Sequence, residues 1–100
     1  MKGLNVGLIK GRHNLPVEFY VYNEIKDVTD VEAIEKEAVR FFEMNKADIY
    51  YIYVTGLTIA LTSVIKAFVD VNKKDSALIL MHYDRESNGY FEQPLFVNGN

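Results

Sequence analysis

The segment from Ile49 to Val71 constrains the fold of this chain more than any other. Residues 49–54 are β-branched and aromatic, as in a β-strand buried on both faces, and they stop at a Thr-Gly-Leu-Thr turn, Thr55–Thr58. A pattern typical of an α-helix follows at once and continues to about Val71. The first N–H groups of a helix lack intrahelical partners, and the helix dipole favours negative charge there. The sequence therefore predicts an anion-binding point at this junction.

The whole chain predicts the element order β-β-α-β-α-β-β. We expect strands at 4–10, 17–25, 49–54, 77–83 and 90–93, and helices at 31–45 and 58–71. The second helix should connect parallel strands, with a hairpin at each end of the chain. Asn88-Gly89 marks the second hairpin, and Pro94, which lacks an N–H donor, places the last strand at a sheet edge or ends it. The fold class is therefore α/β: one small Rossmann-like domain over residues 1–100, with a mixed, partly parallel sheet and two helices and a radius of gyration of about 13 Å.

The two expected helices differ in character. The first begins at a capping-box pattern, in which Thr29 should cap the helix and Glu32 should reach back to Thr29. The second is apolar on nearly all sides, and a short helix in a small domain cannot hide every face. A homodimer through this second helix is therefore expected.

Composition excludes several classes of protein. The net charge of −3 and the pI near 5.3 argue against a broad surface for duplex nucleic acid, which needs basic excess. The absence of cysteine excludes disulfides and thiolate metal sites. A membrane span over residues 49–69 is the weaker alternative to a buried strand, turn and helix, and the first apolar run is too short for a secretory signal. We expect a cytoplasmic protein without membrane partners or a cofactor.

Three groups of residues are candidates for chemistry. Thr55 to Thr58 is either a tight turn, in which Gly56 gives backbone freedom and Thr58 caps the helix, or a phosphate contact, although it is neither a Walker loop nor a dinucleotide fingerprint. Arg12 and His13 form either a solvated turn or a cation beside a titratable imidazole, which together could hold a phosphodiester and move a proton.

The third group, at the end of the fourth strand, leaves similar alternatives. His82 and Asp84 share one face of this strand, while Tyr83 and Arg85 share the other. His82 is either a satisfied strand-end histidine or a base oriented by Asp84. With two histidines and no cysteine, the chain lacks the ligands of a structural zinc site, and we expect no metal centre. Asp84 and a substrate phosphate could still hold a loose divalent ion.

The stretch Ile52–Leu61, Ile-Tyr-Val-Thr-Gly-Leu-Thr-Ile-Ala-Leu, resembles the strand–Thr-Gly-x-Thr–helix signature of CRISPR-associated Rossmann-fold domains and the related small ring nucleases. The ending Tyr83-Asp84-Arg85, Gly89-Tyr90-Phe91 and Gln93 is similar to the closing hairpin of one small ring-nuclease family. The resemblance covers roughly residues 49–93, and Leu57 stands where many members have a second glycine.

The resemblance implies binding of a cyclic oligoadenylate, a second messenger of type III CRISPR antiviral signalling, across a homodimer interface. It places the four residues Thr55, Gly56, Leu57 and Thr58 on a phosphate or ribose, with His82, Asp84 and Arg85 near the ligand. The expected chemistry, if the protein is an enzyme, is attack of a ribose 2′-hydroxyl on phosphorus, which leaves a 2′,3′-cyclic phosphate. Arg12 or Arg85 would then offset charge, and His13 or His82 would be base or acid. The alternatives are a non-catalytic sequestering protein and a dimeric interaction module without a small ligand.

Overall fold

The computed structural model describes residues 2–11, 14–72 and 74–97. Its elements follow the expected order: β1 (Gly3–Ile9), β2 (Phe19–Tyr22), α1 (Val31–Met44), β3 (Ile49–Tyr53), α2 (Thr58–Val71), β4 (Ala77–Asp84) and β5 (Gly89–Phe96). The strands form one sheet in the order β2-β1-β3-β4-β5, in which β5 alone is antiparallel to its neighbour. The prediction of a small Rossmann-like α/β domain with a mixed sheet is confirmed, and the radius of gyration is 12.9 Å.

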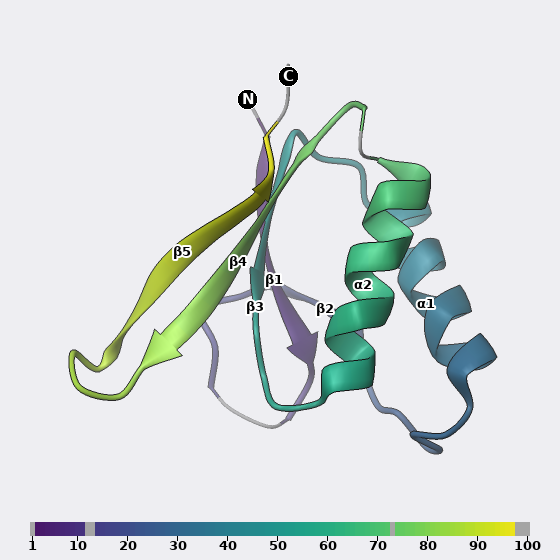
Figure 1. The fold of residues 1–100 in the computed structure, drawn as a ribbon, viewed down its shortest axis with the longest axis horizontal. Helices are drawn as coiled ribbons and strands as arrows, with labels where there is room; N and C mark the ends of the chain where they lie inside the picture. Colours follow the sequence, from purple (N-terminus) through teal and green to yellow (C-terminus); the bar gives the residue numbers. More distant parts are fainter. Residues whose placement is uncertain (1, 12–13, 73, 98–100) are drawn as a thin grey trace.

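Both helices cover the same face of the sheet and pack against each other (Figure 1). Aromatic rings join the two layers, because Phe42 of α1, Tyr50 of β3 and Phe68 of α2 meet edge to face. The ring centroids of Phe42 lie 4.9 Å from Tyr50 and 5.7 Å from Phe68. All three side chains are fully buried, and each contributes a large apolar area to the core.

The second face of the sheet has no helical cover among the described residues. The connection from β1 to β2 would have to supply that cover, and its described residues, 10–11 and 14–18, form no helix. Ile49 and Tyr51 of β3 point to this face and are half-buried. Tyr53, further along the same face, is buried, so the prediction that β3 is buried on both faces holds at Tyr53 and only in part at Ile49 and Tyr51.

The first two strands do not form the predicted hairpin. β1 and β2 run parallel, with Gly7 beside Tyr20 and Ile9 beside Tyr22. β2 begins with Phe19 beside Val6 and is shorter than predicted. Beyond β1, Lys10 N–H donates to the Tyr22 carbonyl at 2.9 Å.

The start of α1 also differs from the prediction. Asp30, not Thr29, is the cap, and its carboxylate accepts from Ala33 N–H at 3.2 Å. The Thr29 hydroxyl and N–H instead donate to Asp27 Oδ1, at 2.6 and 2.9 Å. The carboxylate of Asp27 thus competes successfully for the hydroxyl that the capping box would have used.

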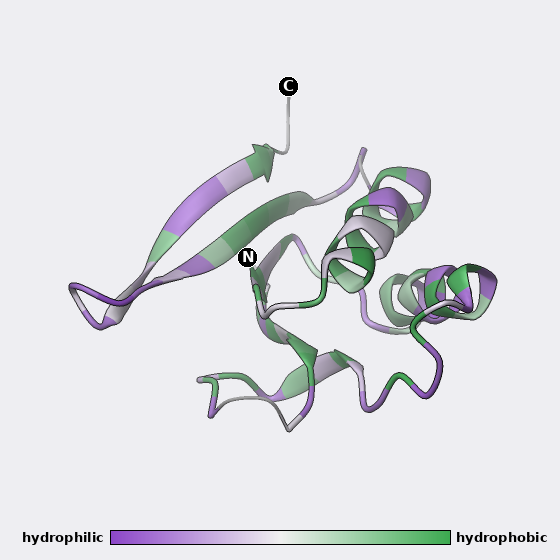
Figure 2. Cartoon of the chain, turned by 60° about the horizontal axis from the view of Figure 1, so that its bottom comes forward, coloured by the Kyte–Doolittle hydropathy of each residue, from purple (hydrophilic) through white to green (hydrophobic). Residues whose placement is uncertain are grey.

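The closing hairpin follows the prediction. Asn88 has a φ of 55°, a conformation that asparagine tolerates, and Gly89 starts β5 directly after it. β5 is an edge strand and continues through Pro94 to Phe96, whose ring stacks on Phe68 with 5.5 Å between centroids. Figure 2 shows β4 as largely hydrophobic and the middle of β5 as hydrophilic, which suits a buried strand beside an edge.

Candidate functional site

A cavity of about 660 Å³ lies at the carboxyl end of β3, where the chain turns toward α2. Three segments form it: the end of β3, the β4–β5 hairpin and the β1–β2 connection. Its lining residues are Asn14, Leu15, Val54, Thr55, Gly56, Tyr83, Arg85, Asn88 and Tyr90. Ligands of doubly wound sheets usually bind outside the carboxyl ends of the parallel strands. We call this space the junction cavity.

Thr55 carries the most informative polar atom of the junction cavity. Its side chain is 7% exposed, and its hydroxyl Oγ1 has no hydrogen-bond partner within the described residues. Its carbonyl accepts from Leu57 N–H at 2.8 Å, which fixes the turn. A buried hydroxyl without a partner costs free energy, roughly 1–3 kcal/mol, unless something else supplies the bond.

The first turn of α2 lacks a side-chain cap. The residue at the cap position is Leu57, which cannot accept a hydrogen bond, so the prediction that Thr58 caps the helix is wrong. Thr58 is instead the first helical residue and is exposed, whereas Leu57 packs against the core. Within α2, the first N–H group with an acceptor among the described residues is that of Ala60, which donates to the Leu57 carbonyl at 3.1 Å. The N–H groups of Thr58 and Ile59 are therefore open to a ligand.

Gly56 serves the junction cavity by its lack of a side chain. A β-carbon built on Gly56 would meet no atom within 4 Å, and the φ of Gly56 lies outside the left-handed region. Backbone freedom, which we expected to explain this glycine, is therefore not what the turn requires. The missing side chain leaves one side of the turn accessible.

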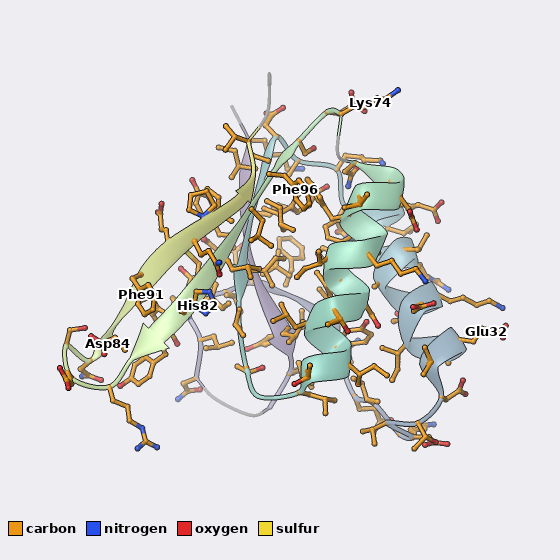
Figure 3. All side chains as sticks on the ribbon, in the orientation of Figure 1. Glu32, Lys74, His82, Asp84, Phe91 and Phe96 are labelled. Atoms are coloured by element: carbon orange, nitrogen blue, oxygen red, sulfur yellow. The ribbon has the colours of Figure 1, made fainter. Side chains whose placement is uncertain are left out.

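The β4–β5 hairpin supplies the positive charge. Arg85 is exposed and has no ion pair among the residues that the structure describes. Asp84 precedes it at the hairpin tip (Figure 3), and its carboxylate accepts from the N–H groups of Glu86 and Ser87, both at 3.3 Å. The Ser87 side chain, followed by Glu86 N–H, lowers the pKa of Asp84. Asp84 therefore holds the turn that carries Arg85.

Aromatic rings form the inner wall of the hairpin. The Tyr53 and Tyr90 ring centroids lie 4.9 Å apart, and those of Tyr83 and Tyr90 lie 5.4 Å apart, both edge to face. The Tyr83 hydroxyl donates to Asn88 Oδ1. Burial raises the pKa of Tyr53, and Tyr90 and Glu92 raise it further, so its phenol is neutral at physiological pH.

His82 lies outside the junction cavity. Its Nε2 is 2.7 Å from Gln93 Oε1, and its ring stacks on Phe91 with 5.4 Å between centroids (Figure 3). His82 and these two contacts lie on the face of the hairpin opposite Tyr83 and Arg85, as strand alternation predicts. The structure thus brings Thr55, Gly56 and Arg85 together and leaves His82 apart.

Arg12 and His13 lie outside the described residues, so their expected roles stay predictions. The described chain holds no group of three or more histidine or acidic side chains suited to a metal ion.

Two other clefts, of about 450 and 590 Å³, are lined by several carboxylates each, which would repel an anion. The junction cavity has no carboxylate among its lining residues.

Sequence reasoning did not select Asn14, Leu15, Tyr83, Asn88 or Tyr90 as site residues. The available signal was strand alternation, because Tyr83 shares a face with Arg85; Tyr90 lies opposite Tyr83 because β4 and β5 pair up to Asp84 and Gly89, with a four-residue loop between them. No comparable signal marked residues 14 and 15, since their position depends on the parallel pairing of β1 and β2.

No protein-family model matches the chain, and comparisons with curated proteins and with solved structures find no match. Neither of the two described helices has the length and apolar character needed to cross a membrane.

Proposed function

We propose that this protein binds a cyclic oligonucleotide second messenger of the cyclic oligoadenylate type, with one phosphate group at the junction cavity. The observation that carries the proposal is the hydroxyl of Thr55, which is buried and unpartnered at the wall of this cavity. A phosphate oxygen would accept the hydrogen bond that the hydroxyl lacks. Because Oγ1 is covered in the free chain, we expect the side chain of Thr55 to rotate when the ligand enters.

The surroundings of Thr55 support an anion over a neutral ligand. The open N–H groups of Thr58 and Ile59 begin a helix of 14 residues whose dipole favours negative charge. Arg85 lines the junction cavity together with Thr55, whereas Thr58 and Ile59 follow Thr55 in the chain and are not among the lining residues; a guanidinium binds phosphate oxygens in a bidentate manner. Both the guanidinium and the helix start would favour an anion in a chain whose net charge is −3.

A symmetric pair of chains would suit a ring-shaped ligand. Each protomer would present one copy of the junction cavity, and a two-fold axis would place the two copies around one ring. The expected contact surface is the outer side of α2, where Val69 is 39% exposed and Leu61 and Ile65 are half-buried. Sedimentation velocity tests this: Val69→Asp should weaken a dimer, whereas Val28→Asp, at an exposed valine before α1, should not.

Sequestration and cleavage are both compatible with this ligand, and one observation favours sequestration. None of the described residues that line the cavity is a histidine or a carboxylate, so the described wall offers no general base of ordinary pKa. Cleavage through attack of the ribose 2′-hydroxyl would need such a group from elsewhere, and His13 stays the predicted candidate.

The decisive experiment is a titration with cyclic tri-, tetra- and hexa-adenylate, followed by chromatography of the nucleotide. A ligand at 100 times its Kd adds about 2.7 kcal/mol to the free energy of unfolding, which raises Tm by about 10 °C or more. Intact nucleotide at the end supports sequestration, and a linear product supports a ring nuclease. No stabilisation by any of the three rings would contradict the proposed function and favour an interaction module.

Thr55→Val tests whether the buried Thr55 hydroxyl contributes to binding. It keeps the shape of the side chain and removes the hydroxyl, so we expect weaker binding with unchanged folding. Thr62→Val, at an exposed threonine one turn into α2, should bind as the unmodified protein does.

A further inference from the structure

The hairpin wall of the junction cavity consists of aromatic rings that the protein does not bury. Tyr83 is 49% exposed, and Tyr90 is half-buried, although both line the cavity. Tyr53, which is 9% exposed, packs edge to face against Tyr90 and supports its ring. Exposed aromatic rings that are fixed in place form a stacking surface that loses little side-chain entropy when a flat ligand binds.

A fixed amide stands beside these rings. Asn88 accepts the Tyr83 hydroxyl hydrogen with its side-chain oxygen, which orients its NH₂ group as a donor. Asn88 also lines the cavity, and its backbone conformation is set by the hairpin turn. Amide donors of this kind bind the ring nitrogens and carbonyl oxygens of nucleobases.

We propose that this wall binds a nucleobase, which stacks on the exposed ring of Tyr83, contacts Tyr90 at an angle because the two ring planes lie 64° apart, and accepts a hydrogen bond from Asn88. The inference rests on the proposed function and extends it, because the phosphate then occupies the Thr55 side of the cavity and the base the hairpin side. The unit that one chain recognises is accordingly a nucleoside phosphate, not phosphate alone. A volume of about 660 Å³ falls in the range of small-molecule sites, about 300–1,000 Å³.

This division of the cavity also bears on how a ring is held. A ring of several nucleotides carries several bases and phosphates, whereas one chain offers one aromatic wall and one open helix start. A ring would therefore use one such unit from each protomer and leave its remaining bases less closely contacted. Base identity would be read at the contacted positions only.

The test compares three probes on the full chain: adenosine 5′-monophosphate, ribose 5-phosphate and cyclic tetra-adenylate. The chain has seven tyrosines and no tryptophan, so stacking is measured directly by quenching of tyrosine fluorescence. We expect the adenosine phosphate to bind about tenfold or more tightly than ribose 5-phosphate, since one base–aromatic stack contributes that much.

Variants of the hairpin assign the effect to its wall. Tyr83→Leu should lower affinity for adenosine 5′-monophosphate about tenfold and leave ribose 5-phosphate unchanged, while Tyr83→Phe keeps the ring and most of the base preference. Phe91→Leu is the control, because Phe91 is 55% exposed on the opposite face of the same hairpin. Circular dichroism identifies any variant that fails to fold, and Tyr90→Leu then takes its place.

The possible results separate this inference from the function on which it rests. Equal affinity for the two monophosphates, with binding of cyclic tetra-adenylate retained, would overturn the base site and leave the phosphate site standing. Equal loss in Tyr83→Leu and Phe91→Leu would also overturn it. No binding of any probe would overturn both proposals.

Discussion

The two ends of β3 use their polar groups in different ways. At the amino end, the Tyr50 hydroxyl donates to the Asn45 carbonyl at 2.5 Å and accepts from Ala47 N–H at 3.0 Å and the Asn72 amide at 3.2 Å. At the carboxyl end, the buried Thr55 hydroxyl has no partner among the described residues. The Tyr50 hydroxyl at the amino end therefore bonds within the fold, whereas the Thr55 hydroxyl at the carboxyl end makes no bond within the described chain.

The two helix starts show the same contrast. Asp30 caps α1, and Glu32 adds negative charge to its first turn. Leu57 stands at the start of α2, and the first turn of α2 contains no acidic residue. The chain thus supplies its own carboxylate to the start of α1 and none to the start of α2, which is where the proposed function places the anion.

The largest effect that we expect on stability distinguishes the two ends of β3. Tyr50→Phe leaves the Ala47 N–H and the Asn72 amide short of a partner, and should lower the free energy of unfolding by about 1–3 kcal/mol. Thr55→Val removes a hydroxyl that already lacks a partner, so stability should stay the same or rise. Urea denaturation measures both, and an equal loss in the two variants would contradict the comparison.

Charge on the hairpin should have the next largest effect. Arg85→Gln removes the exposed guanidinium of the cavity, and we expect affinity for cyclic tetra-adenylate to fall about 10- to 100-fold, as for the loss of a charge-assisted hydrogen bond. Calorimetric titration gives the change. Arg40→Gln, on the exposed side of α1, is the control, and the same loss there would indicate a general charge effect.

Adding a negative charge at the start of α2 should weaken its attraction for an anionic ligand. Thr58→Asp complements the dipole and should stabilise the free chain by about 0.3–1 kcal/mol. It should also weaken cyclic tetra-adenylate binding about tenfold, because the new carboxylate repels the phosphate. Thr62→Asp lies one turn further along α2 and should change the affinity much less; thermal denaturation with and without ligand compares the two.

The smallest effect concerns pH and the hairpin tip. The folded pKa of Asp84 lies below its ordinary value of 3.8, so its contribution is present above that pH and is lost as the pH falls through the lower folded value. The Glu86 and Ser87 N–H chemical shifts should therefore titrate in that acidic range and stay constant near pH 7. Nuclear magnetic resonance measures these shifts, and an Asp84→Asn variant in which they still titrate over this range would disprove the assignment.

Much of the fold could be predicted from local patterns. The strand-to-helix junction at Thr55–Thr58, the Asn88-Gly89 turn and the edge position of β5 all depend on nearby residues, and the structure agrees. The direction of β2 could not be predicted, because it depends on how residues 10–18 return along the sheet. Asp30 caps α1 in place of the predicted Thr29, because the Thr29 hydroxyl donates to Asp27 instead.

The candidate site could be predicted less completely. Thr55, Gly56 and Arg85 line one cavity as expected, since two of them follow β3 and the third follows β4, its parallel neighbour. The role of Tyr90 depends on the strand register across the hairpin, which only the assembled sheet fixes. Sequence alone also gave no reason to expect that Leu57 would hold the cap position and leave the helix start open.

The most direct test of the central claim follows the backbone amides of the junction by nuclear magnetic resonance while cyclic tetra-adenylate is added. The account predicts saturable shifts of the Gly56, Thr58 and Ile59 N–H signals, with a single dissociation constant, and no comparable shift at the start of α1. Saturable shifts confined to the start of α1, or no saturable shift at the junction, would contradict it.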